Sequence, residues 1–183
     1  MAFAHGFKSK ANRIALAVRE KMSLRPSSPI DPVEICRLYE FELFTLSKVP
    51  CDCQAFLGEQ APAFSAMTIS RGIRTLIVHN DSHHPNRQRS NICHEIAHRF
   101  LGHKDAPPLN DEGQRMHDGG IEAEANFLAG TLLIPNEAAI RIAISQMDPL
   151  AAQRHYGVSA DMLEFRLRMS GAHKMARRSR RSP

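Results

Sequence analysis

The chain has 183 residues, of which 43% are hydrophobic and 23% are charged. This size and balance exclude an intrinsically disordered chain and fit one domain with a single core rather than two ordinary domains. No apolar run approaches the roughly 20 residues that a membrane-spanning helix needs, and the N-terminal residues lack the pattern of a secretory signal. We therefore expect a soluble, cytoplasmic protein with no membrane partner.

The excess of basic residues is confined to the C-terminal segment. The chain carries 24 basic and 19 acidic residues, a formal charge of +5, and residues 172–183 contain five basic residues and no acid. Because the rest is neutral, the folded part shows no sign of a basic groove for nucleic acid. We interpret residues 1–171 as a single domain and residues 172–183 as a disordered basic tail, whose contact with nucleic acid is weak.

The first half of the chain predicts two helices followed by a small sheet. Apolar residues at helical spacing indicate a helix over residues 7–18, and Asp31 before Pro32 is typical of the start of a second helix, over 31–39. Short apolar segments separated by proline and glycine then indicate a mostly antiparallel sheet. Its expected strands are residues 41–46, 54–57, 64–69 and 73–79.

The second half of the chain returns to helical periodicity. The expected helices lie near residues 87–102, 119–133, 137–145, 148–156 and 159–169. The order of helices, sheet and helices predicts an α+β fold, with N-terminal helices, a small sheet, a central helix and a C-terminal helical segment. Cys51 and Cys53 are too close for an ordinary disulfide, and we interpret the four cysteines as reduced thiols.

The central helix carries the segment His94-Glu95-Ile96-Ala97-His98, which is a His-Glu-x-x-His motif. It places two imidazoles one helical turn apart, about 6 Å in rise, so that both can reach one metal ion. On a helical projection the apolar residues occupy one side, and His94, Glu95 and His98 occupy the other. A surface helix with two solvated histidines would show the same division, so a third ligand has to decide between the two interpretations.

A catalytic zinc site uses three protein ligands and leaves a fourth position open. A third histidine in the extended form of the motif is excluded, because Leu101 and Lys104 stand where glycine and histidine are required. The helix over 119–133 supplies two acids instead. Glu124 lies about 60° from the centre of its apolar stripe and Glu122 about 100°, so the projection favours Glu124 as the third ligand. A carboxylate beside an apolar stripe needs a partner, and a metal ion provides one.

These residues resemble the ImmA/IrrE-type metallopeptidases, which are gluzincin-like zinc proteases of bacteria and their mobile elements. The first similar segment runs from Arg89 through the motif to Leu101-Gly102-His103, and the second is Glu122-Ala-Glu124-Ala-Asn126 through Pro135. A third lies between Tyr156 and Leu167. The resemblance covers roughly residues 7–171.

The resemblance implies a zincin-like fold in which His94, His98 and Glu124 bind one zinc ion and Glu95 is the catalytic base. Two imidazoles and a carboxylate favour Zn²⁺ and also suit Mn²⁺ or Fe²⁺. The implied substrate is a helix-turn-helix transcriptional repressor, cut at one site in a stress response or in control of a mobile element.

Two other functions are compatible with the sequence. The first is a non-catalytic zinc-binding module that sequesters a repressor, for which Glu95 would be dispensable. The second is a DNA-binding regulator, suggested by the helix pair over 148–169, although two acids in its second helix would repel phosphate.

A metallopeptidase also needs a group that stabilises the oxyanion. The sequence offers four candidates without ranking them: Arg89, His103, His117 and Tyr156. We expect His83 and His84, which lie in a turn, to be exposed to solvent.

Overall fold

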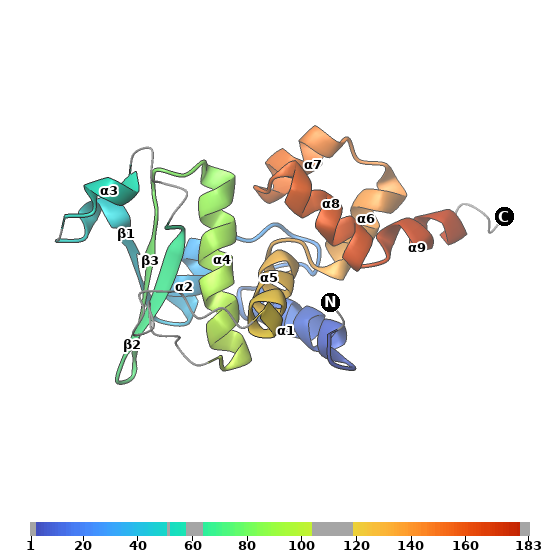
Figure 1. The fold of residues 1–183 in the computed structure, drawn as a ribbon. Helices are drawn as coiled ribbons and strands as arrows, with labels where there is room; N and C mark the ends of the chain where they lie inside the picture. Colours follow the sequence, from blue (N-terminus) through green and yellow to red (C-terminus); the bar gives the residue numbers. More distant parts are fainter. Residues whose placement is uncertain (1–2, 51, 58–63, 104–118, 180–183) are drawn as a thin grey trace.

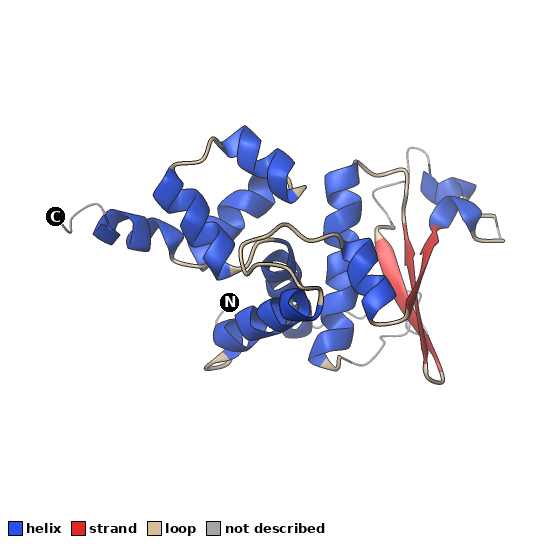
Figure 2. Ribbon diagram, turned by 180° about the vertical axis from the view of Figure 1, so that it is seen from behind, coloured by secondary structure: helices blue, strands red, loops and turns tan. Residues whose placement is uncertain are grey.

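The computed structural model describes residues 3–50, 52–57, 64–103 and 119–179. Its α+β class is as predicted. A three-stranded sheet lies at one side of the molecule, helix α4 (Pro85–Leu101) packs across it, and helix α5 (Gly119–Leu133) packs against the other side of α4 (Figures 1 and 2). Two layers of contact therefore hold the helix that carries the motif.

The sheet contains β1 (Phe41–Thr45), β2 (Ala66–Arg71) and β3 (Arg74–His79) in the order β1-β3-β2. It is mixed rather than mostly antiparallel, because β1 pairs with β3 in parallel and β2 pairs with β3 antiparallel. The strand predicted at 54–57 is wrong. These residues form the short helix α3 (Gln54–Leu57), whose first backbone N–H donates to the Asp52 side chain as at a helix N-cap.

The predicted helices are present with small shifts at their ends. Asp31 caps α2 (Pro32–Leu38), since its carboxylate accepts from the backbone N–H of Val33. The remaining elements are α1 (Phe7–Lys21), the short 3₁₀ helix η1 (Leu46–Lys48), α6 (Asn136–Ser145), α7 (Pro149–Tyr156) and α8 (Ala160–Met169). Within the described ranges no single helix has both the length and the apolarity to cross a membrane, and only the bent pair α5 and α6 meets those criteria together.

The segment expected to be a disordered tail differs from that expectation. Residues 172–179 form the helix α9 (Ala172–Ser179), which packs against α6 and α8 (Figure 1). Ala172 and Ala176 lie four residues apart and are both buried, while the basic side chains point outward. The spacing of these two small residues is typical of a packed helix, but the basic residues around them favoured the prediction of a disordered tail. Residues 180–183 lie outside the described residues.

Two fully buried arginines bind the C-terminal end of α5. Arg19 of α1 donates to the carbonyl oxygen of Leu132 at 2.8 Å, and Arg166 of α8 donates to the carbonyl oxygen of Ile134 at 2.8 Å. These carbonyls have no partner within the helix and form the negative end of its dipole. Burial lowers the pKa of each guanidinium to about 10, which leaves both protonated at neutral pH. α5 is thus fixed at one end by charge-assisted hydrogen bonds.

We expect Arg166→Met to lower the free energy of unfolding by about 2 kcal/mol, because it leaves a buried carbonyl without a donor while keeping most of the side-chain volume. Urea denaturation measures this loss. Arg168→Met, an exposed substitution on the same helix, is the control and should change stability by less than about 0.5 kcal/mol. Equal effects of the two substitutions would contradict the proposed anchoring of α5.

Candidate metal centre

The His-Glu-x-x-His motif lies in the C-terminal half of α4. Its apolar residues are buried as the projection predicted, but Glu95, which was expected on the same side as the histidines, is buried as well. Ile92, Cys93, Ile96 and Ala97 are buried. Burial raises the pKa of the Cys93 thiol to about 12, and this neighbour of the motif does not belong to the group of side chains whose ligand atoms converge. The motif histidines instead lie on the side of α4 that meets α5.

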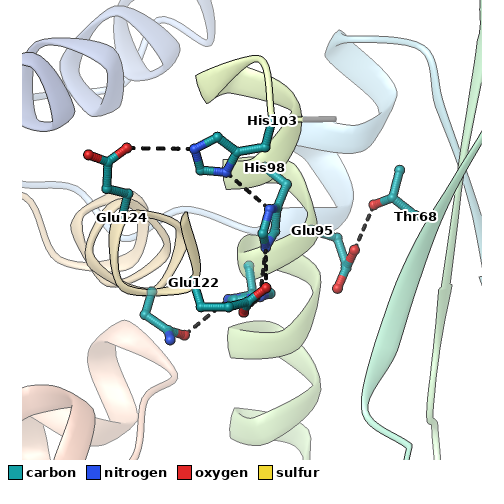
Figure 3. Close-up of polar contacts among 8 residues, drawn as sticks. Thr68, Glu95, His98, His103, Glu122 and Glu124 are labelled. Carbon is teal, nitrogen blue, oxygen red and sulfur yellow. Dashed lines mark hydrogen bonds and ion pairs between the residues drawn. The ribbon is translucent and has the colours of Figure 1, made fainter. Parts of the chain in front are cut away.

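Three potential ligand atoms converge between α4 and α5 (Figure 3). The Nε2 atoms of His94 and His98 lie 3.0 Å apart. The carboxylate of Glu122 lies 3.2 Å from Nε2 of His94 and 3.7 Å from Nε2 of His98. All three groups are partly exposed, with 18–32% of each side chain accessible, so they remain open to solvent on one side. Two imidazoles and one carboxylate around an open position form the ligand set of a catalytic zinc site.

Each motif histidine has a polar partner for its second nitrogen. Nδ1 of His94 lies 3.0 Å from Oδ1 of Asn126, and Nδ1 of His98 lies 3.1 Å from Nδ1 of His103. A partner that accepts the Nδ1 proton leaves the Nε2 lone pair free for a metal ion. Through these contacts His94 and His98 are suited to bind a divalent metal ion.

Glu124, the predicted third ligand, does not lie in this cluster. Its carboxylate is 3.6 Å from Nε2 of His103, whereas Glu122 faces the motif histidines (Figure 3). Residues two apart in sequence are about 200° apart around a helix, so the two acids point in different directions, Glu122 to the motif histidines and Glu124 to His103 beyond the end of α4. The projection assumed that the apolar stripe marks the side of the metal, but from Phe127 to Leu133 α5 is buried on all sides. The geometry therefore favours Glu122 over Glu124 as the third ligand.

Glu95 lies on the side of α4 that faces the sheet and is only 9% exposed. Its Oε2 accepts a hydrogen bond of 2.7 Å from the hydroxyl of Thr68 on β2 (Figure 3). Sequence reasoning did not find Thr68, because nothing in the local pattern indicates which residue of a strand meets the motif. It also left Asn126 without a role, although its spacing of four from Glu122 places both on one side of α5.

Two of the four oxyanion candidates, Tyr156 and Arg89, make contacts elsewhere in the fold. The Tyr156 hydroxyl donates to the carbonyl of Ser27, and the Arg89 guanidinium donates to the carbonyl of Ile30, which makes both structural. His117 lies outside the described residues. His84 is exposed as expected, but the expectation for His83 is wrong: it is 7% exposed, and its Nδ1 lies 3.2 Å from Nδ2 of Asn91.

Comparison with known families agrees with this geometry. The model of the IrrE N-terminal-like domain, a peptidase family, matches residues 58–168, which is more than half of the chain. The chain belongs to this family. The match spans both the motif on α4 and the acids on α5, so the predicted resemblance to the ImmA/IrrE-type peptidases is confirmed. A search among curated proteins found no match. Membership in the IrrE N-terminal-like family and the His-His-Glu cluster together support a metallopeptidase-type site.

We expect Glu122→Ala to reduce the zinc content of the purified chain from about one ion to nearly none, because it removes one of three ligands. Glu124→Ala should retain most of its zinc. Elemental mass spectrometry on the two variants and the wild type measures the difference. Loss of zinc from Glu124→Ala alone would show that the third ligand is the one first predicted from the sequence.

Proposed function

We propose that this chain is a zinc-dependent endopeptidase that cuts a helix-turn-helix repressor at one site. The observation that carries the proposal is the convergence of His94, His98 and Glu122 on one point, with Glu95 in the same motif of α4. A site with three ligands, an open position and an adjacent carboxylate has the composition of a hydrolytic zinc centre.

His94, His98 and Glu122 would hold the zinc ion, which would supply Lewis acidity to make water more acidic and to polarise a peptide carbonyl. Glu95 takes the proton from the attacking water as the C–O bond forms, and delivers it to the amine as the C–N bond breaks. Its burial and its hydrogen bond from Thr68 hold the carboxylate in one orientation. A carboxylate that is already held in one orientation does not have to give up rotational freedom before each proton transfer.

Strand β2 offers a place for an extended substrate. Within the described residues β2 pairs with β3 alone, which leaves the backbone groups of its other edge available. Thr68 and Ser70 of β2 both contact side chains of α4, at Glu95 and Arg99 respectively. An unfolded segment added to this edge as a further strand would pass close to Glu95. This arrangement supports cleavage of a peptide bond in an extended stretch of a protein.

The repressor as substrate follows from the resemblance to the ImmA/IrrE-type peptidases. A flexible segment of such a repressor can adopt the extended conformation that is required to pair with the edge of β2.

Glu95→Gln should abolish cleavage while the zinc content and the melting temperature stay at wild-type values, because glutamine cannot accept the proton. The assay incubates the zinc-loaded chain with purified helix-turn-helix repressors encoded next to it, and intact mass spectrometry detects the two fragments. Cleavage by Glu95→Gln would refute the role of the base. Binding of a repressor by both forms without cleavage by either would favour a sequestering module.

Thr68→Val should lower kcat about tenfold without loss of zinc, since it removes a hydrogen bond to the charged carboxylate of Glu95 and keeps the shape of the side chain. The same assay, run as a time course at saturating repressor, measures kcat. Ser70→Ala is the matched control, because Ser70 lies on the same strand and contacts Arg99 rather than Glu95. An unchanged kcat in Thr68→Val would show that Thr68 does not position the base.

A further inference from the structure

A chain of three side chains extends from the metal centre to the surface of α5. Nδ1 of His98 lies 3.1 Å from Nδ1 of His103, and Nε2 of His103 lies 3.6 Å from the carboxylate of Glu124 (Figure 3). The side chain of His103 is only 9% exposed, and its two ring nitrogens face these two partners. Neither His103 nor Glu124 belongs to the group of atoms that converge on the metal position.

The backbone explains why His103 turns back onto the helix that precedes it. Gly102 adopts φ 71°, in the left-handed region that glycine enters without strain, and ends α4. The backbone N–H of His103 then donates to the carbonyl of His98 at 3.0 Å, and the backbone N–H of Gly102 donates to the carbonyl of Arg99 at 3.2 Å. This pair of bonds is a Schellman motif. It places the His103 side chain beside that of His98.

The proton positions along the chain follow from the metal centre. If Nε2 of His98 binds the metal, the proton of the neutral ring is on Nδ1, and Nδ1 donates to His103. Nδ1 of His103 must then be the acceptor, so its own proton is on Nε2. That N–H points toward the Glu124 carboxylate at a distance longer than a hydrogen bond but short enough for electrostatic attraction. Glu124 thus favours one tautomer of His103, which in turn favours the metal-binding tautomer of His98.

We propose that His103 and Glu124 are positioning residues that tighten metal binding through His98, and that Glu124 acts only through His103. The proposal rests on the proposed metal centre of His94, His98 and Glu122, and it assigns to Glu124 a function different from that of a ligand. Partners behind a metal-bound histidine fix the orientation of its ring and raise its basicity, and their loss commonly weakens metal binding by 10- to 100-fold.

The first experiment measures zinc affinity of the full chain by competition with a chromophoric chelator. His103→Phe should bind zinc roughly 10- to 100-fold more weakly, because phenylalanine fills the space without an acceptor. His103→Asn should recover most of the affinity, since its amide oxygen can stand near the position of Nδ1. His155→Phe, on the exposed surface of α7, is the matched control and should bind like wild type.

Loading the chain with Co²⁺ gives a spectrum that a general loss of stability would not change. The absorption spectrum of the Co²⁺-loaded chain reports the ligand geometry, so His103→Phe should shift the visible bands and His103→Asn should leave them near those of wild type. Identical spectra and identical zinc affinity for wild type and His103→Phe would overturn the proposal while leaving the metal centre intact. A wild-type chain that binds neither metal would overturn both this proposal and the proposed function.

A double-mutant cycle tests the link between the two residues. Glu124→Ala should weaken zinc binding by less than His103→Phe does, in keeping with its longer contact, and should add nothing in the His103→Phe background. Additive effects would show that Glu124 acts independently of His103, which contradicts the proposal. Glu164→Ala, an exposed acid on α8, controls for the loss of one negative charge.

Discussion

The candidate site depends on the packing of α5 against α4. The ligand atoms come from both helices, so neither helix can form the site alone. Ala97 lies one helical turn from His94 on α4, and Ala125 lies one turn from Glu122 on α5. Both alanines are fully buried. Small side chains at a helix contact allow the axes to approach closely, which brings a short carboxylate within reach of two imidazoles.

The surrounding fold maintains this contact from both sides. The sheet supports α4 from behind and supplies Thr68 to Glu95, while Arg19 and Arg166 hold the far end of α5 through its terminal carbonyls. Removal of water from two guanidinium groups is costly, and their hydrogen bonds to otherwise unpartnered carbonyls offset that cost. The same hydrogen bonds fix the position of α5 along its axis. The buried charges therefore serve the geometry of a site that lies at the other end of the helix.

Local patterns were sufficient to predict much of the molecule. The spacing of His94 and His98 and the apolar side of their helix are properties of one segment, and the structure places them as predicted, whereas Glu95 faces the sheet and not the side of the histidines. The third ligand depends on how two helices meet, which a single projection does not contain, and there the geometry favours Glu122 over Glu124. The helix at 172–179 was missed for a related reason: only the packing of α9 against α6 and α8, with Ala172 and Ala176 buried, distinguishes it from a solvated basic tail.

We propose that α4 and α5 together hold one metal ion through His94, His98 and Glu122. Anomalous X-ray diffraction at the zinc absorption edge, on crystals of the zinc-loaded chain, tests it most directly. We expect one strong anomalous peak that lies about 2.0–2.2 Å from Nε2 of both histidines and from the Glu122 carboxylate, the distances that zinc makes to nitrogen and oxygen ligands. A peak within bonding distance of the Glu124 carboxylate, or no peak between the two helices, would contradict the proposed site.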